Sequence, residues 1–547
     1  MASPTEQAAK LKEDGNRLYG LKDYAAAHGK YSKAISLDAS NAVLYANRAA
    51  CLFAMKKSAI SMLSSVPSES STSNLSPATE IDPLYTKAWA RLGAAFKNVP
   101  GCKGQSIEAY RRALSTLPIE NLSESERNIK VQCETELASV TKKTPTDGKY
   151  VVAPPEFAEK LPWQRALRMK AELQAEVARG ILSSGWVLFL AYEEFTMGMN
   201  MIKQVRRIGP SGGIFGGKEG IQWLSNSLIT DSRVFHLDDP DFLKKYRIQV
   251  EFEVVQNKAF VTGGAENLIT EIPKMLEESG WDVARPAFTT TVRCWMMSGF
   301  LTDSLGGDSP GAVQFYDEVI QALEWGRQAW RNVPKEQRGA VFEDTFLRGV
   351  KCLRFDCYMK ASLADPSKFP LEMLHQDAQD MIREVNAAVI PSDPHLHPGY
   401  ILASFVYPKG HALAMTGSYR DLGKVKASRS DAKPGEAETC LREAVKAYQQ
   451  AADVYPKDDE NHVYYLCCSY DLLILCGSYS VREALTIGEK VRAALPGMKK
   501  IWEFSSMASE RDKCITRVLA AEADLRKEVE AGRYTMSSYV SPIIVAQ

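Results

Sequence analysis

Five polar side chains near the start of the chain have types and spacings that could bind a ligand. Lys12 and Asn16 lie four residues apart, Lys87 and Arg91 do the same in the run YTKAWARLG, and Asn47 lies between the pairs. On a helix, residues four apart share a face. Lys offers a point charge, Arg a fork of donors and Asn a neutral amide. The alternative is an ordinary solvated face, with an asparagine that bonds only within its own unit.

A repeating helical pattern contains these residues. Residues 8–41 place packing residues in a 34-residue frame, and the frame returns in residues 86–118. Residues 42–52 repeat its first helix, and residues 119–142 are typical of a closing helix. Such helix–turn–helix units stack into a superhelix. The first frame is marked by Leu11, Gly15, Leu18, Ala27, Tyr31 and Ala34, and its return by Trp89, Leu92, Gly93, Phe96, Tyr110, Ala113 and Pro118.

The second unit of the pattern is irregular. Its frame runs from Ala42 to Thr86, which is 44 residues and ten more than the usual length. Where its second helix is expected, residues 58–77 contain nine serines and two prolines. Because serine competes for backbone hydrogen bonds and proline stops helices, we expect a loop there. An unusual splice form or an artefact of the sequence would give the same pattern.

The runs LKEDGN, LYANRAA and YTKAWARLG resemble the dicarboxylate-clamp tetratricopeptide repeats of chaperone cofactors, such as the Hop-type organising proteins and the small glutamine-rich tetratricopeptide proteins. All five residue types of that family's clamp stand at the matching positions Lys12, Asn16, Asn47, Lys87 and Arg91. The resemblance implies that they bind the terminal carboxylate and last aspartate of heat-shock chaperones (70 and 90 kDa classes) ending in Glu-Glu-Val-Asp. It therefore predicts a cytoplasmic adaptor or co-chaperone, with no enzymatic activity and no cofactor.

The rest of the chain predicts a second helical domain. We expect a clamp-type repeat domain over 1–142, a linker over 143–160 and a divergent, tetratricopeptide-like domain over 161–547. Within the last, CLREAVKAYQQAADVYPKDDE (440–460) keeps the Ala/aromatic/Ala spacing of a second repeat helix. The overall prediction is an all-α fold in which a tetratricopeptide superhelix precedes a second helical-repeat array that binds an unknown protein partner.

Periodicity also predicts individual elements of this second domain. The segment 240–256 alternates like a strand, but Phe242, Tyr246, Val250 and Val254 share a helix face, and we favour a helix. Loops are expected at 206–220 and 420–435. Helices are expected at about 161–199, 311–331, 341–363, 371–389, 399–416, 436–455, 460–476 and 480–494.

Other motifs are weak. GGIFGGK (212–218) satisfies a phosphate-loop spacing but is followed by Glu219, so the magnesium-binding hydroxyl is missing. His395 and His397 flank a turn and have no further ligands nearby, so we predict no metal site. Cys352 and Cys357 are expected to be core thiols of one helix.

Composition narrows the class of protein. The chain has 547 residues, which is enough for two or three domains, with 67 basic and 67 acidic residues. This balance favours neither nucleic acid nor membrane surfaces as partners. The longest apolar run, 181–192, is too short to span a bilayer, and eleven cysteines without CxxC pairs fit reduced thiols. Two alternatives remain open: a general repeat scaffold unrelated to chaperones, and an enzyme site in the C-terminal half.

Overall fold

A computed structural model provides the structure of the chain. The residues it describes are 4–20, 24–54, 81–97, 103–118, 122–141, 155–208, 213–239, 241–260, 263–393, 395–427, 436–476 and 479–540. The serine-rich stretch 58–77 and residues 143–154 of the expected linker lie outside these ranges. The chain divides into two compact units, one with residues 1–150, 202–221 and 241–339, the other with residues 151–201, 222–240 and 340–547. The boundaries at 142 and 161 stay a prediction.

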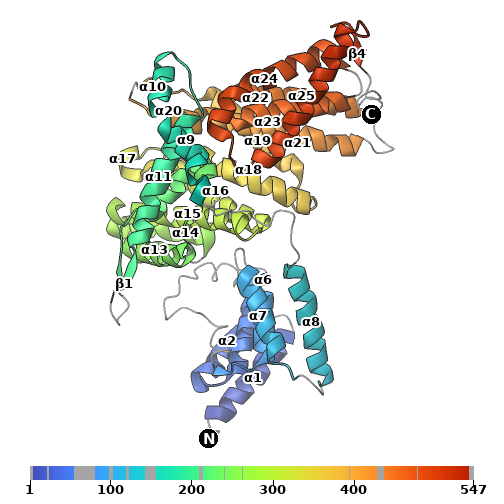
Figure 1. The fold of residues 1–547 in the computed structure, drawn as a ribbon. Coiled ribbons are helices and arrows are strands. Elements are labelled where there is room, and N and C mark those ends of the chain that lie inside the picture. The colour runs from blue at the N-terminus through green and yellow to red at the C-terminus, as the bar shows by residue number, and fades with distance from the viewer. Residues whose placement is uncertain are drawn as a thin grey trace. The chain divides into compact units, whose positions relative to one another are not determined.

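Helical pairs form the N-terminal region. Its described helices are α1 (Pro4–Gly20), α2 (Tyr24–Leu37), α3 (Ala42–Ala54), α6 (Thr86–Lys97), α7 (Lys103–Ser115) and α8 (Glu124–Thr141) (Figure 1). Each packs on its neighbour in the chain, and α3 packs directly on α6. The repeat frame predicted from the sequence therefore corresponds to paired helices, and α8 is the expected closing helix.

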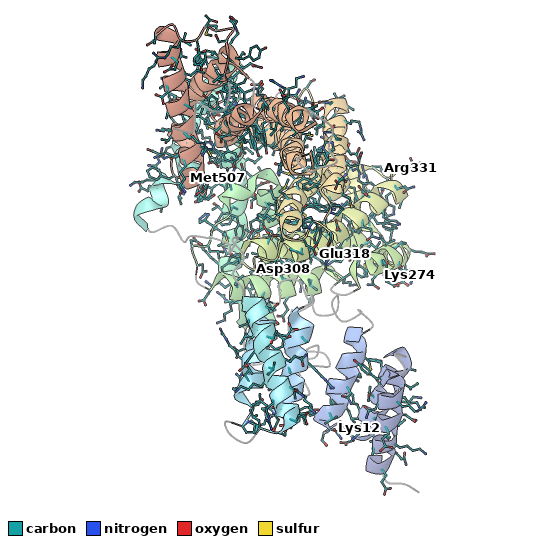
Figure 2. All side chains as sticks on the ribbon, turned by 90° about the vertical axis from the view of Figure 1, so that its right-hand side faces the viewer. Lys12, Lys274, Asp308, Glu318, Arg331 and Met507 are labelled. Atoms are coloured by element: carbon teal, nitrogen blue, oxygen red, sulfur yellow. The ribbon has the colours of Figure 1, made fainter. Side chains whose placement is uncertain are left out.

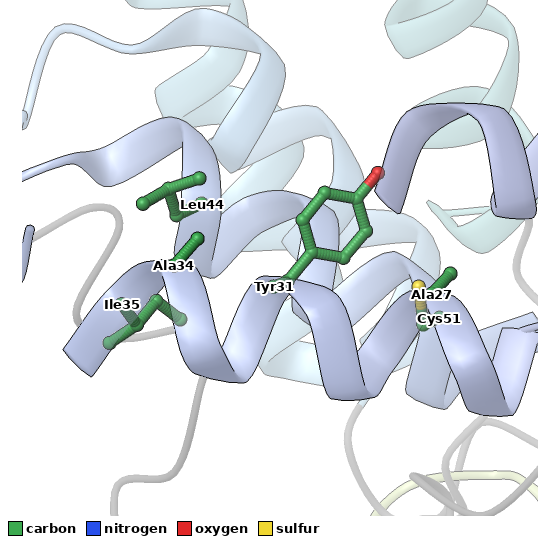
Figure 3. Close-up of a cluster of buried hydrophobic side chains, with 6 residues drawn as sticks. All are labelled: Ala27, Tyr31, Ala34, Ile35, Leu44 and Cys51. Carbon is green, nitrogen blue, oxygen red and sulfur yellow. The ribbon is translucent and has the colours of Figure 1, made fainter. Parts of the chain in front are cut away.

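Tyr31 fills the space between the first helices. It is 1% exposed, and Ala27, Ala34, Leu44 and Cys51 are buried around it (Figure 3). Gly15 on α1 allows the close approach, because a Cβ there would lie 2.7 Å from Cε1 of the Tyr31 ring. Gly93 on α6 faces the Tyr110 ring in the same way, also at 2.7 Å. The small and large residues of the frame are thus complementary packing partners.

This packing predicts the effect of a single methyl group. Gly15→Ala should lower the free energy of unfolding by about 1–3 kcal/mol, because the Tyr31 ring must move. Gly29→Ala on α2 is the control: its Cβ meets nothing within 4 Å, and alanine should raise stability by about 0.5–1 kcal/mol. Urea unfolding of the full chain, followed by circular dichroism, compares the two variants. Equal effects would contradict this packing.

A second group of helices completes the first unit. A short hairpin, β1 (Arg206–Ile208) paired antiparallel with β2 (Gly213–Phe215), precedes α13 (Phe242–Asn257), α14 (Gly264–Ser279), α15 (Trp281–Ser304), α16 (Ser309–Ala329) and α17 (Lys335–Arg338). Helix α15 contacts α13, α14 and α16 and buries Phe288, Val292 and Met296. The helix favoured over 240–256 is confirmed as α13. The prediction of a loop at 206–220 is wrong in part, because residues 206–208 and 213–215 form this hairpin.

The second unit is also helical. It contains η1 (Pro155–Lys160), α9 (Pro162–Arg168), α10 (Lys170–Ala178), most of α11 (Gly185–Gln204) and α12 (Gly220–Asp231), η2 (Ser232–Val234), η3 (Ala340–Phe342), α18 (Asp344–Ala364), α19 (Leu371–Ala387), α20 (Pro398–Ile401), a π-helical turn (Leu402–Val406), α21 (Tyr407–Ala427), α22 (Glu436–Val454), α23 (Glu460–Leu475), α24 (Val481–Trp502) and α25 (Ala508–Glu530). The strands β3 (Tyr479–Ser480) and β4 (Tyr539–Val540) pair antiparallel. The all-α fold is confirmed.

Three element predictions in this unit need correction. The single helix expected at 161–199 is broken into α9, α10 and α11, since Gly180 has a positive φ of 77° after α10. The loop expected at 420–435 is wrong in part, because α21 continues to Ala427, and residues 428–435 lie outside the described ranges. Helix α25 was not predicted. In the part of the chain that the structure describes, no helix is long and apolar enough to cross a membrane.

Candidate functional site

Three helices carry the five residues singled out in the sequence. Lys12 and Asn16 lie on α1, Asn47 lies on α3, and Lys87 and Arg91 lie on α6. Two alanines bring α3 and α6 together: Ala42 is 8% exposed and Ala88 is 2% exposed, with Tyr45 and Tyr85 packed against them.

A chain of hydrogen bonds links the three helices. The Tyr31 hydroxyl donates to Asn16 Oδ1 at 2.7 Å, and Asn47 Nδ2 donates to the same oxygen at 3.1 Å. Arg91 then donates from an NH group to Asn47 Oδ1 at 2.7 Å. The structure therefore joins Asn16, Asn47 and Arg91 although they come from three different helices.

The sequence pattern predicts only a packing role for Tyr31, yet its hydroxyl is the first donor in this series of hydrogen bonds. Its ring lies in the core while its oxygen points away from the buried cluster (Figure 3). Burial, followed by the neighbouring Cys51 thiol, raises the pKa of Tyr31 to about 12, so its hydroxyl stays protonated and can donate. No signal in the sequence separates a packing tyrosine from one that also orients an asparagine.

The two lysines are placed differently from the asparagines. Lys12 is half-buried on α1, where Figure 2 labels it, and Lys87 is exposed on α6. Neither has a hydrogen bond or ion pair with any residue in the described ranges. The carboxylate that interacts electrostatically with Lys12 is that of Asp38, which accepts hydrogen bonds from Ser40 and Asn41. The lysines are thus available for a ligand, but no contact joins them to the other three residues.

This arrangement can bind a compact anion. Arg91 uses one NH group on Asn47, and a guanidinium has five N–H donors, so others remain. Lys12 and Lys87 add two ammonium groups from α1 and α6. Donors on different helices can approach a carboxylate from different directions, and charge-assisted bonds of this kind are the strong ones. We name Lys12, Asn16, Asn47, Lys87 and Arg91 the donor face.

The glycine-rich run does not offer a phosphate site. Helix α12 begins after it at Gly220, where a phosphate would need free backbone N–H groups. The Ile221 N–H instead donates to the Glu253 carboxylate at 2.9 Å, and Gln249 donates to the Gly217 carbonyl at 2.6 Å. A carboxylate of the chain itself occupies the position that a phosphate loop reserves for its ligand.

Glu253 makes stability depend on pH. It is 2% exposed, and burial raises its pKa from 4.5 to about 7. Because folding raises the pKa of Glu253, the contribution of this residue to the free energy of unfolding is most favourable below about pH 4.5, where the carboxyl is protonated. That contribution is lost as pH rises through about 7 and the buried group ionises. The full difference is about 3 kcal/mol at 1.36 kcal/mol per pH unit. Urea unfolding at pH 5 and pH 8 should show this loss in the native chain and much less in Glu253→Gln; the same slope in both would contradict it.

The remaining candidates serve the fold. His397 Nδ1 accepts from the Gly399 N–H at 3.0 Å and so caps α20. Cys352 and Cys357 share α18, and Cys357 is buried. Among the described residues, no group of three or more His, Cys, Asp or Glu side chains could hold a metal ion.

The fold and the donor face together define the class of the N-terminal region. It consists of tetratricopeptide repeats, with polar donors on first helices and apolar packing between helices. No family model matches the chain.

Comparison with known proteins finds relatives of this kind. The chain is 34% identical over 112 residues to a heat-shock protein cognate co-chaperone, sgt12, of Aspergillus fumigatus. It is also 34% identical over 113 residues to small glutamine-rich tetratricopeptide repeat-containing protein 2 of Saccharomyces cerevisiae. These matches cover 20% and 21% of this chain and 30% of each relative. A heat shock protein sti1 homolog of Schizosaccharomyces pombe is 35% identical over 107 residues, or 20% of this chain and 16% of that protein.

Solved structures align over more of the chain, but their TM-scores are low. The tetratricopeptide domain of P58(IPK) gives a TM-score of 0.21 at 11% identity, covering 96% of this chain and 99% of its own. Yeast Tom70 gives 0.22 at 14% identity, covering 97% and 99%. Scores at this level carry no argument about how the helices are arranged.

Proposed function

We propose that the chain is a co-chaperone adaptor whose donor face binds the C-terminal Glu-Glu-Val-Asp tail of cytoplasmic heat-shock chaperones. The observation that carries this proposal is the hydrogen-bonded chain from Asn16 through Asn47 to Arg91, flanked by Lys12 and Lys87. The similarity to sgt12 and to small glutamine-rich tetratricopeptide protein 2 supports the same partner class.

The chemistry of such a tail fits the donor face. Its last aspartate carries two carboxylates, one at the chain end and one on the side chain, within a few ångströms of each other. Lys12, Lys87 and Arg91 supply three positive charges, and the two asparagines supply neutral polar groups between them. Each charge-assisted hydrogen bond contributes about 1.5–3 kcal/mol, so two or three suffice to anchor a short peptide.

Two synthetic peptides test the proposal with the full chain. One ends in Glu-Glu-Val-Asp with a free carboxylate, and the other has the same sequence with an amidated terminus. Calorimetric titration should detect binding of the free acid and at least tenfold weaker binding of the amide. Equal binding of both, or of neither, would overturn the proposal; equal binding would instead favour a general repeat scaffold.

The adaptor role also implies a function for the helices after residue 161, which belong in part to each of the two compact units. An adaptor needs a further partner, and we assign that partner to the helical array after residue 161. Affinity capture with the full chain, compared with a chain carrying Lys87→Ala and Arg91→Ala, would separate partners of the donor face from partners of the array. A second partner should remain bound in the double variant.

A further inference from the structure

A cavity of about 330 Å³ lies within the second unit, lined by residues of α12, α18, α21 and α23 and by Met507, whose position Figure 2 labels. Its volume is in the range of small-molecule sites and exceeds what a single water needs. No motif in the sequence analysis corresponds to it, because its wall is built from segments more than 200 residues apart.

The charged groups around Arg233, on one side of the cavity, are paired with one another. The Arg233 guanidinium, which lines it, contacts three carboxylates: Asp231 at 2.6 Å, Asp459 at 3.2 Å and Glu460 at 3.4 Å. Arg511 offsets part of this charge by pairing with Glu460 at 3.0 Å. Three acidic groups thus face two guanidiniums, and the positive charge of Arg233 is not available to a ligand.

The carboxylate of Asp356 also lines the cavity. Asp356 Oδ1 pairs with His411 Nε2 at 2.9 Å, while Oδ2 makes no hydrogen bond or ion pair with any residue that the structure describes. The Asp356 side chain is 50% exposed although it lines a cavity. Burial disfavours a charged imidazole, but the Asp356 carboxylate raises the pKa of His411 well above its ordinary value. Burial raises the pKa of Asp356, but His411 and then Lys360, also on α18, lower it below its ordinary value; Lys360 is not part of the lining.

Three tyrosine rings contact one another in the wall of the cavity. Tyr407 and Tyr455 meet edge to face with centroids 5.0 Å apart, and Tyr465 lies 5.9 Å from Tyr455. All three line the cavity. The faces of aromatic rings attract cations, most strongly where water is excluded. Aromatic rings in the same cavity as a carboxylate oxygen without a hydrogen-bond partner form a combination that can recognise an ammonium group.

We propose that this cavity binds an alkylammonium group, with Asp356 Oδ2 as its counter-ion and the rings of Tyr455 and Tyr465 as its walls. The group comes either from a free small amine or from a lysine side chain of a protein partner. Both sources present the same cation on an apolar stem, and Met507 and Leu353 supply apolar lining for that stem.

Calorimetric titration of the full chain with three probes tests this proposal. The probes are n-butylammonium, N-acetyl-lysine amide and its uncharged counterpart N-acetyl-norleucine amide. Binding of the first two at least tenfold more tightly than the third is the expected result. Binding of butylammonium alone would assign the site to free amines, and binding of both to lysine side chains. If neither cation bound, or if the norleucine compound bound as tightly as the cations, the proposal would be overturned.

A matched pair of variants locates the site. Asp356→Asn keeps the shape of the side chain and an acceptor for His411, and should weaken ammonium binding at least tenfold. Asp380→Asn on α19 is the control, because its side chain is 52% exposed and lies outside the cavity. Thermal unfolding confirms that both variants are folded. Unchanged affinity in a folded Asp356→Asn variant would overturn the assignment.

Discussion

Replacing Lys87 or Arg91 with alanine is expected to weaken binding of a free-acid Glu-Glu-Val-Asp peptide by about 10- to 150-fold each. This range corresponds to the loss of one charge-assisted hydrogen bond of about 1.5–3 kcal/mol, at about 1.4 kcal/mol per factor of ten. Lys87 is exposed and makes no hydrogen bond or ion pair with the described residues. The loss in Lys87→Ala should therefore appear in affinity and not in stability, as measured by calorimetry and by urea unfolding, whereas Arg91→Ala also removes the hydrogen bond to Asn47.

The control for this prediction is Lys33→Ala. Lys33 is an exposed cation on α2, a second helix of the repeat frame, so it lies outside the donor face. Its removal should leave the affinity unchanged within a factor of two. If Lys33→Ala and Lys87→Ala weakened binding equally, the peptide would be responding to the general charge of the region, and the donor face would have no special role.

Arg233→Met is expected to cost the second unit about 3–5 kcal/mol of its free energy of unfolding. Removing one partner from a buried ionic network leaves the others uncompensated, which is where such costs arise. The side chains of Asp459 and Glu460 are 0% exposed, and that of Asp231 is 4% exposed. Methionine keeps an unbranched apolar stem but lacks the guanidinium, so the effect reports the loss of its charge and hydrogen bonds. Chemical unfolding followed by tryptophan fluorescence suits the measurement, because Arg233 lies 3.9 Å from the centre of the Trp502 ring.

An exposed ion pair of the same unit provides the comparison. Lys513 pairs with Glu510 at 2.8 Å on α25, but their side chains are 67% and 75% exposed. Lys513→Met should therefore cost only about 0–1 kcal/mol, as surface pairs usually do. A loss in Arg233→Met as small as that in Lys513→Met would mean that the network does not stabilise the unit.

Local spacing predicted the parts of the donor face that lie on one helix. Lys12 and Asn16, and Lys87 and Arg91, share faces because the helix repeats every 3.6 residues. The bond from Arg91 to Asn47 could not be predicted, since it spans 44 residues and depends on how α6 packs on α3 after the serine-rich stretch. The small residues Ala42 and Ala88 are the features that set this packing, and they are too common to be a signal on their own.

The polar contacts of the second unit could not be predicted either, because they also join residues that are far apart in the sequence. Periodicity predicted four of its helices, α18, α19, α22 and α23, within a few residues, but α12 and α25 were not predicted. Its polar network connects Arg233 to Asp459 across 226 residues, and Asp459 also caps α23 by accepting from the Asn461 N–H. A sequence shows that a residue can cap a helix, but not that the same carboxylate meets an arginine from a distant segment. The β1–β2 hairpin was missed because glycines weaken the alternating pattern by which strands are recognised.

A double-mutant cycle measures directly whether Lys87 on α6 binds the terminal carboxylate of the peptide. The four affinities to measure are those of the native chain and of Lys87→Ala, each with the free-acid peptide and with its amide. The lysine substitution and the amidation of the peptide should not be additive. Lys87→Ala should weaken binding of the acid at least tenfold and barely alter binding of the amide. Additive losses, with the same effect of Lys87→Ala on both peptides, would contradict the claim that this lysine holds the carboxylate.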